Sequence, residues 1–363
     1  MRRIRAAVAE TPGAPFVVGD LDLGEPRPDE VLVRMTAAGI CHTDLGMRDT
    51  WPGGLTPMVF GHEGTGRVEA VGAKVRGVAP GERVCLTFAS CGACEQCATG
   101  HPAYCLHARS LNFSGGRADG TTPLTRDGTP VHGGFFGQSS FATYAVVRER
   151  GVVPVPADLP DEVAAPLGCS GQTGAGTVLN RLRPDPGASL VVTGAGGVGL
   201  SAVMAAVAVG CDPVVAVDPV PARRALAVEL GAKAALPPGD GLVAALRDLT
   251  GGGTHHVVET TGRPEVARQA VAALRPRGEL ALVGLGGEVT FDVMPLLAKG
   301  VRVHGVIEGD SHPGRFLPDL IGLWRRGLFP LETLVTTFPF EEIGSAVRAM
   351  EEGGVVKPVL VFD

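Results

Sequence analysis

The 363-residue sequence lacks the long apolar run of a membrane-spanning helix and the basic excess of a nucleic-acid-binding protein. Its most apolar stretch, Val198–Gly210, is shorter than the roughly 18 residues that a bilayer requires, and it follows a glycine-rich loop. The formal net charge is −6 and the pI is about 5.9, so nothing favours a polyanionic partner. We therefore expect a protein that binds neither membranes nor nucleic acid.

Targeting and disulfide patterns are also missing. The first residues, MRRIRAAVAE, carry arginines but not the apolar core of a signal peptide. Eight cysteines in a chain of this length do not resemble a secreted disulfide framework, because a large core needs no covalent staples. There is no internal repeat and no block of like charges. We expect a cytoplasmic protein.

The length of the chain and its 45% hydrophobic content predict two domains. Residues 1–170 hold short β-rich runs divided by glycine and proline, which we place at Val31–Met35, Thr65–Val71, Arg83–Phe88 and Phe141–Val147. Residues 112–137 contain few apolar side chains and predict loops with a hairpin. The tail, 308–363, predicts helices over Pro318–Arg326 and Phe340–Met350 and a strand over Pro358–Phe362, and we expect it to return to the first domain.

Residues 171–307 alternate apolar runs with helical patterns. The predicted strands are Leu190–Thr193, Val214–Val217, Ala234–Leu236, His256–Glu259, Leu280–Val283 and Val301–Val306. The predicted helices between them are Gly199–Val209, Ala222–Leu230, Leu242–Leu249 and Pro264–Leu274. This order indicates an α/β domain with a Rossmann-type, doubly wound parallel sheet, which binds ligands at the carboxyl ends of its strands.

A glycine-rich loop joins the first of these strands to its helix. The motif G-A-G-G-V-G begins at Gly194, which permits a tight turn, while Gly196 allows a pyrophosphate to approach and Gly199 allows close helix–strand packing. The phosphates would lie at the helix N-terminus, where free N–H groups favour anions. The loop residues that we expect at the cofactor are Gly194, Gly196, Gly197, Val198 and Gly199.

Asp218 ends the second predicted strand, 19 residues after Gly199. A carboxylate at this place binds the ribose diol of NAD and repels the 2′-phosphate of NADP, so we predict NAD. Arg223 and Arg224 leave a 2′-phosphate open as an alternative, but we expect them to line the adenosine side of the site.

Four cysteines are closely spaced as C-x2-C-x2-C-x7-C: Cys91, Cys94, Cys97 and Cys105. Such spacing allows the thiolates to converge on one ion at a Zn–S distance of ~2.3 Å. Four thiolates complete a tetrahedral shell, so this zinc would be structural. Iron–sulfur ligation is a competing interpretation, and a DNA-reading zinc module is disfavoured because few lysines and arginines surround the cluster.

Other motifs carry a family resemblance. C-H-T-D at 41–44, G-H-E-G at 61–64, V-E-A-V-G at 68–72, the four-cysteine lobe at 91–105 and the glycine loop occur in the order of the zinc-containing medium-chain alcohol dehydrogenases, over essentially the whole chain. The segments F-F-G-Q-S-S-F-A-T-Y-A at 135–145, P-L-G-C-S-G-Q-T-G-A-G at 166–176, G-V-I-E-G-D-S at 305–311 and K-P-V-L at 357–360 resemble the aryl-alcohol branch of this family. The resemblance implies a GroES-like catalytic domain at 1–170 and an NAD-binding domain at 171–307.

The resemblance also implies a catalytic zinc, for which spacing alone gives no argument. Its ligands would be Cys41, His62 and Cys169, with the fourth position left to water or to the substrate oxygen. Such a zinc lowers the pKa of an alcohol so that hydride leaves for nicotinamide, or polarises an aldehyde in reverse.

Further roles follow from the same resemblance. Asp44 would accept a hydrogen bond from His62, Glu63 would approach the metal from behind, and Thr43 would take the alcohol proton. His42 and Lys357 would lie near the cofactor phosphates. Residues implied near the nicotinamide carboxamide are Val283, Val306 and Glu308, and those implied in the substrate pocket are Trp51, Thr87, Phe113, Leu285 and Ile307.

One departure concerns the proton relay, since Leu45-Gly46-Met47 occupies the place where many family members carry a histidine. The proton would then leave through water or through His42.

We therefore expect an NAD-linked enzyme with two zinc ions per chain, acting on a primary aromatic or allylic alcohol or its aldehyde. The alternatives are a thiol-adduct (formaldehyde-type) dehydrogenase and a non-catalytic dinucleotide-binding protein. The resemblance also implies a homodimer or homotetramer, in which the last predicted parallel strand, Val301–Val306, would pair with a second subunit at the edge of the sheet.

Overall fold

The computed structural model describes residues 1–363, which divide into two compact units. Unit 1 comprises Met1–Cys169, His312–Pro318 and Glu332–Asp363, and unit 2 comprises Ser170–Ser311 and Asp319–Leu331. No helix has both the length and the apolar character that a bilayer-spanning segment needs.

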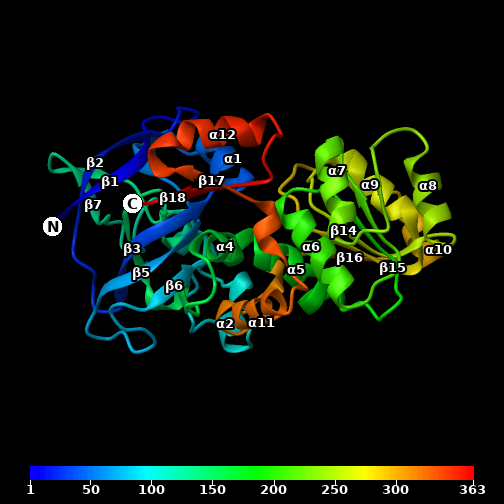
Figure 1. Cartoon of the computed structure of the whole chain (residues 1–363), viewed down its shortest axis with the longest axis horizontal. Coiled ribbons are helices and arrows are strands. Elements are labelled where there is room, and N and C mark those ends of the chain that lie inside the picture. The colour runs from blue at the N-terminus through cyan, green and yellow to red at the C-terminus, as the bar shows by residue number, and fades with distance from the viewer. The chain divides into compact units, whose positions relative to one another are not determined.

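Unit 1 is built around two largely antiparallel sheets (Figure 1). The first sheet has the strand order β4-β1-β2-β7-β8. Its strands are β1 (Arg2–Ala9), β2 (Val17–Leu23), β4 (Met58–Val59), β7 (Leu124–Arg126) and β8 (Thr129–Val131). Strands β7 and β8 form the hairpin that the loop-rich 112–137 region predicts.

The second sheet has the order β10-β6-β5-β3-β18-β17, with β9 paired to β3. Its strands are β3 (Glu30–Gly39), β5 (Glu63–Val71), β6 (Arg83–Leu86), β9 (Tyr144–Arg148), β10 (Val152–Pro154), β17 (Val335–Pro339) and β18 (Lys357–Val361). Strand β3 is central, because Gly39 pairs with Glu63 of β5 on one side and with Val359 of β18 on the other. The starts of β5 and β18 are therefore brought to the end of β3.

Short helices connect these strands. They are α1 (His42–Thr50), α2 (Glu95–Ala98), α3 (Ala108–Asn112), α4 (Asp161–Pro166) and α12 (Ile343–Glu351). Helix α1 was not predicted, because its sequence HTDLGMRDT has no apolar periodicity; its start is fixed by the Asp44 carboxylate, which accepts a hydrogen bond from the Cys41 N–H. Helix α11 (Pro313–Arg325) begins five residues before the predicted helix, and Pro318 lies inside it.

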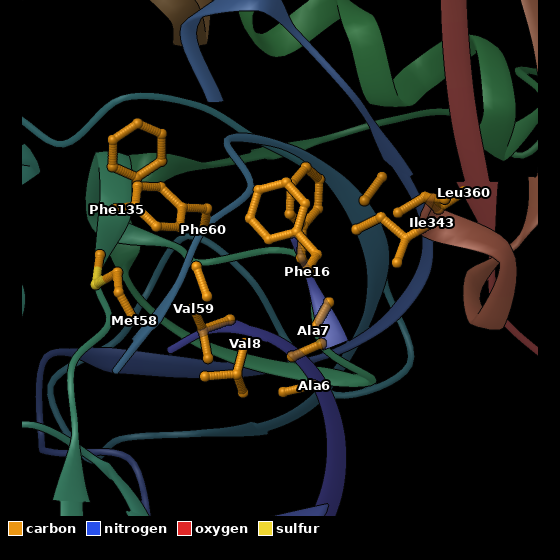
Figure 2. Close-up of a cluster of buried hydrophobic side chains, with 14 of the residues drawn as sticks. Ala6, Ala7, Val8, Phe16, Met58, Val59, Phe60, Phe135, Ile343 and Leu360 are labelled. Atoms are coloured by element: carbon orange, nitrogen blue, oxygen red, sulfur yellow. The ribbon is translucent and has the colours of Figure 1, made fainter. Parts of the chain in front are cut away.

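The core of unit 1 packs around aromatic side chains. Phe60 and Phe135 are fully buried, and their ring centroids lie 5.0 Å apart in an edge-to-face arrangement. Figure 2 shows Phe16, Phe60 and Phe135 packed with Met58 and neighbouring aliphatic side chains. This cluster fixes the segment that leads from β4 to His62.

Unit 2 contains a six-stranded, wholly parallel sheet in the order β13-β12-β11-β14-β15-β16. Its strands are β11 (Leu190–Thr193), β12 (Val214–Val217), β13 (Ala234–Leu236), β14 (Thr254–Glu259), β15 (Leu274–Leu282) and β16 (Arg302–Gly305). Its helices are α5 (Gln172–Gly176), α6 (Gly197–Ala208), α7 (Pro221–Glu229), α8 (Leu242–Leu249), α9 (Pro264–Ala273) and α10 (Val293–Lys299). The predicted doubly wound parallel sheet is confirmed, with shifted ends in β14, β15 and β16.

Candidate functional site

Four buried side chains form a compact group in unit 1: Cys41, His62, Glu63 and Cys169. Their ligand atoms all lie within 4.8 Å of one another. Cys41 caps the N-terminus of α1, His62 and Glu63 stand where β5 begins, and Cys169 lies in a π-helical turn, Leu167–Gly171, after α4. Residues distant in sequence thus meet in one place.

The hydrogen bonds of His62 leave one ring nitrogen for a further partner. Nδ1 lies 2.7 Å from Asp44 Oδ1, which selects the tautomer with its lone pair on Nε2. Nε2 is buried and has no hydrogen-bond partner. A buried imidazole nitrogen beside two cysteine sulfurs fits a soft cation such as zinc, because it would otherwise be unsatisfied.

Electrostatics act differently on the members of this group, because they favour the thiolate of Cys41 while burial raises the pKa of Glu63. A hydrogen bond from Cys169, together with Lys357 and His62, holds the pKa of Cys41 well below its usual value despite burial. Burial opposes the imidazolium, yet the Asp44 carboxylate raises the pKa of His62 well above its usual value, so a metal ion bound at Nε2 would take the place of a proton there. A thiolate is the form in which cysteine binds zinc.

Lys357, which was predicted to lie near the cofactor phosphates, is paired with Glu63 in the structure. Its Nζ contacts both carboxylate oxygens of Glu63, at 2.8 and 2.9 Å, and the Ile40 carbonyl at 3.1 Å. Three acceptors account for the three N–H groups of the ammonium, and the side chain is only 3% exposed. Lys357 is therefore the buried counter-ion of Glu63.

The remaining predicted residues of α1 lie at its first turn. Thr43 is half-buried, with Oγ1 3.7 Å from Cys41 Sγ, whereas His42 is exposed. A Cβ atom at Gly46 would meet no atom within 4 Å, so the place of the missing histidine is open space.

Aromatic rings lie against His62. The Phe136 ring stacks on the imidazole at a centroid distance of 4.5 Å, and Phe135 meets it edge-on at 5.5 Å. Phe113 is half-buried against both phenylalanines. Phe113 was predicted in the substrate pocket, but Phe135 and Phe136 were not, although the F-F-G-Q segment that contains them carries part of the family resemblance.

The other expected pocket residues are more dispersed. Trp51 is 3% exposed and packs against Phe60 and Phe135, with Nε1 bonded to the Leu55 carbonyl, so it belongs to the core. The buried Thr87 hydroxyl donates to the Gly168 carbonyl beside Cys169. Leu285 and Ile307 belong to unit 2, where they are exposed.

The four-cysteine lobe forms a second metal-site-like group. Cys91 Sγ lies 3.9 Å from Cys97 Sγ, and Cys94 Sγ lies 3.9 Å from Cys105 Sγ. Four sulfurs around one zinc at ~2.3 Å are about 3.8 Å apart, so the lobe fits a single ion better than a cluster of several irons. Backbone N–H groups of Cys97 and Leu106 lower the pKa of Cys94 to about 6, whereas burial raises the pKa of Cys97 to about 12.

The glycine loop of unit 2 has the geometry of an anion site. Gly194 has φ +88°, and a Cβ atom at Gly199 would lie 1.7 Å from the Gly194 carbonyl oxygen, so both positions require glycine. Helix α6 begins directly at Gly197, which points its free N–H groups at the loop. Val198 lies in the first turn of this helix.

Asp218 closes this loop from the end of β12. One carboxylate oxygen accepts from the Ala195 N–H at 2.7 Å and the other from the Val220 N–H at 2.8 Å. Arg224 donates to the carbonyls of Asp218 and Pro219, and the buried Arg223 Nε has no hydrogen-bond partner. Of the two arginines, Arg224 therefore braces the turn.

The residues expected near the carboxamide lie where β15 and β16 end. The Val283 N–H donates to the Glu259 carbonyl, and the buried Val306 N–H donates to the Leu282 carbonyl. Glu308 accepts hydrogen bonds from Gln172 Nε2 at 3.1 Å and Thr173 Oγ1 at 3.4 Å. All of them are at the carboxyl edge of the parallel sheet, where such sheets bind ligands.

A cavity of about 210 Å³ lies elsewhere in unit 1. Its lining includes Leu124 and Tyr144, and the Glu30–Arg117 ion pair, whose N···O contacts are 2.7 Å, stands at its wall. It contains no member of either cysteine group. Because its charged groups pair with one another, it has no evident chemistry.

Comparison with known proteins decides the family. Residues 27–157 match the alcohol dehydrogenase GroES-like domain, and residues 197–321 match the zinc-binding dehydrogenase family. The geraniol dehydrogenase of Castellaniella defragrans is 49% identical, over 99% of this chain and 97% of its own. This chain belongs to the zinc-containing alcohol dehydrogenases. It is a zinc-dependent alcohol dehydrogenase, as its resemblance in sequence predicts.

Two further relatives are similar over almost the whole chain. The crystal structure of benzyl alcohol dehydrogenase from Acinetobacter calcoaceticus superimposes with a TM-score of 0.96 at 42% identity, covering 100% of both chains. The S-(hydroxymethyl)glutathione dehydrogenase of Haemophilus influenzae is 34% identical, over 99% of this chain and 97% of its own.

Proposed function

We propose that this dehydrogenase oxidises primary allylic or aromatic alcohols with NAD, and reduces the corresponding aldehydes, at a zinc held by Cys41, His62 and Cys169. The observation that carries the metal assignment is the buried, unpartnered His62 Nε2 beside two cysteine sulfurs. When bound, zinc supplies a Lewis acid that polarises the substrate oxygen, and NAD accepts the hydride.

The chain's own residues prepare this reaction. Asp44 holds the His62 ring through Nδ1, and the Thr43 hydroxyl lies close enough to Cys41 to accept the alcohol proton. Because position 46 is open, the proton passes from Thr43 to water. Glu63 and Lys357 neutralise one another behind the thiolates, where an unpaired charge would be costly.

We propose NAD as the cofactor because of Asp218. Its carboxylate lies at the end of β12 beside the glycine loop, where it would accept hydrogen bonds from the ribose hydroxyls of NAD and repel the 2′-phosphate of NADP. We also propose a structural zinc at Cys91, Cys94, Cys97 and Cys105, which holds the lobe without an open coordination position.

The substrate class follows from the relatives and from the rings beside His62. Geraniol is an allylic alcohol and benzyl alcohol is an aromatic one. The rings of Phe113, Phe135 and Phe136 form a hydrophobic surface that can contact the hydrocarbon part of such alcohols. The S-(hydroxymethyl)glutathione relative favours a second candidate, a thiol-adduct alcohol.

The test is NADH formation from NAD with geraniol, benzyl alcohol, ethanol and S-(hydroxymethyl)glutathione, with zinc counted per chain. We expect turnover of the first two, two zinc ions per chain, and one zinc with no activity in Cys41→Ser and Cys169→Ser. Cys211→Ser, which changes a buried thiol outside both groups, is the control. Activity that survives Cys41→Ser would refute the zinc assignment, and preference for the glutathione adduct would favour the second candidate.

We further propose a homo-oligomer that pairs through the free edge of β16. This strand ends the parallel sheet, and Val303 on it is 40% exposed. Met294 and Leu297 of the preceding α10 are 67% and 69% exposed. Leu297→Lys should shift the sedimentation of the protein toward the monomer, whereas Val17→Lys in unit 1 should not; a Leu297→Lys variant with unchanged mass would contradict this interface.

A further inference from the structure

The segment that follows β8 has an unusual backbone. Gly134, Phe136, Gly137 and Ser139 have φ values of +71°, +50°, +70° and +54°. Two of these are glycines, which adopt such angles freely, but a bulky phenylalanine at positive φ is disfavoured. A strained residue of this kind persists only where its surroundings determine it.

This conformation places the Phe136 ring on the face of an expected zinc ligand. The ring is nearly parallel to the His62 imidazole, with an interplanar angle of 25° and a centroid distance of 4.5 Å. Phe135 meets the same imidazole edge-on at 83°. Asp44 fixes Nδ1, so His62 is held at its edge and on its face by different side chains.

The residues after Phe136 hold the His62 segment as well. Gln138 Nε2 donates to the His62 carbonyl at 2.8 Å, and its Oε1 accepts from the Gly64 N–H at 3.1 Å. Ser139 Oγ donates to the Val59 carbonyl at 2.6 Å and accepts from the Phe135 N–H at 3.1 Å. These bonds anchor the strained turn to the backbone on both sides of His62.

We propose that Phe136 is a positioning residue for His62: its left-handed backbone lays the ring on the imidazole, and the stack keeps Nε2 directed at the Cys41 and Cys169 sulfurs. The inference rests on the proposed catalytic zinc. Phe136 touches the ligand and not the metal, so its loss weakens metal retention by letting the imidazole rotate. Retention at the four-cysteine lobe does not depend on it.

The test compares three variants of the full-length protein. Phe136→Leu keeps an apolar side chain but removes the aromatic face, and Phe136→Tyr keeps that face. Phe113→Leu is the matched control, because Phe113 lies 5.0 Å from Phe136 and 6.1 Å from Phe135 without a ring contact to His62. The measurements are the rate of zinc release to a chromophoric chelator, the absorption spectrum of cobalt-substituted protein, and the unfolding midpoint.

We expect Phe136→Leu to release one of its two zinc ions about 10-fold faster or more, as loss of an outer-shell partner of a ligating histidine does. The second zinc should leave at the unchanged rate, and the cobalt spectrum should change. The Phe136→Tyr and Phe113→Leu variants should both release zinc at the rate of the unsubstituted protein.

Three results would overturn the proposal. Unchanged release from Phe136→Leu would show that the stack positions nothing. Faster release of both zinc ions with a lower unfolding midpoint, matched by Phe113→Leu, would show a packing role. If Cys41→Ser still binds two zinc ions, the metal assignment itself fails, and the proposal fails with it for that separate reason.

Discussion

Replacement of Asp44 should separate the folding role of the site from its metal role. The carboxylate is wholly buried and accepts three hydrogen bonds, from the Cys41 N–H at 2.9 Å, the Gly61 N–H at 3.2 Å and His62 Nδ1 at 2.7 Å. Asp44→Ala leaves three buried donors without an acceptor, each costing ~1–3 kcal/mol. Because water fills part of the vacated space, we expect a loss of about 3–5 kcal/mol in the free energy of unfolding.

Asp44→Asn should cost less stability but still affect the metal. Its amide oxygen can serve Gly61 and His62, while its NH2 group then faces the Cys41 N–H, a donor against a donor. We expect a loss of about 1–3 kcal/mol in stability, and zinc affinity at the His62 group lower by ~10–100-fold.

Urea unfolding of the zinc-loaded protein and after chelation, with chelator competition for zinc, measures both effects. The control is Asp49→Asn in the same helix, because Asp49 is exposed and pairs only with Arg48 on the surface. If Asp44→Asn matched this control in unfolding free energy and held both zinc ions as tightly, the structural role assigned to Asp44 would be wrong.

Three other predictions follow from the structure. Lys357→Met should lower the unfolding free energy, measured by urea titration, by about 3–5 kcal/mol, because it leaves the buried Glu63 carboxylate without its counter-ion. Adding Glu63→Gln to this variant should recover much of the loss. If the losses of the two single variants simply added in the double variant, the pairing would be contradicted. Asp218→Ser should raise the KM for NAD about 10-fold and raise kcat/KM for NADP, because it removes the carboxylate that braces the loop and repels a 2′-phosphate. If the ratio of kcat/KM for NAD to that for NADP did not change, this role of Asp218 would be excluded. Burial raises the pKa of Cys85 to about 12 and that of Cys211 to about 11, so at pH 8 only ~10⁻⁴ of the first thiol and ~10⁻³ of the second is ionised. Peptide mapping after treatment with iodoacetamide should therefore find both cysteines unmodified in the folded protein. Labelling of either cysteine before the protein unfolds would contradict their burial.

The parallel sheet of unit 2 could be predicted because its first three strands are apolar, and two of them, β11 and β12, are buried along their whole length. Leu190–Thr193, Val214–Val217 and Ala234–Leu236 are short apolar runs between turn residues, and the structure has strands with those bounds. In contrast, β1 and β2 were missed. Three of the first four residues of Arg2–Ala9 are arginines, and Val17–Leu23 contains a glycine and two aspartates, so both runs are more polar than a typical strand. The alternation that is present, over Arg3–Ala6 and Asp20–Leu23, covers only four residues in each run.

The sequence alone predicts the four-cysteine site, but it does not predict the site formed by Cys41, His62 and Cys169. The spacing of Cys91 to Cys105 is local, and short loops between thiolates already restrict the geometry to a single centre. Cys41, His62 and Cys169 are separated by long stretches that fold into both sheets of unit 1. Only the antiparallel register of β3 with β5, and the turn after α4, bring them together, so a resemblance had to supply what spacing could not.

The side chains around the His62 group depend on tertiary contacts that no motif encodes. Lys357 was expected near the cofactor phosphates because of the family resemblance, but β18 pairs with β3 and starts where Glu63 stands. Once both are buried, each charge requires the other, since an isolated ion there would be far less stable than the pair. Phe136 is a similar case, because its contact with His62 depends on a left-handed backbone angle that a phenylalanine rarely adopts and that its neighbours enforce. In both places the residue type was visible in the sequence, and the fold determined its partner.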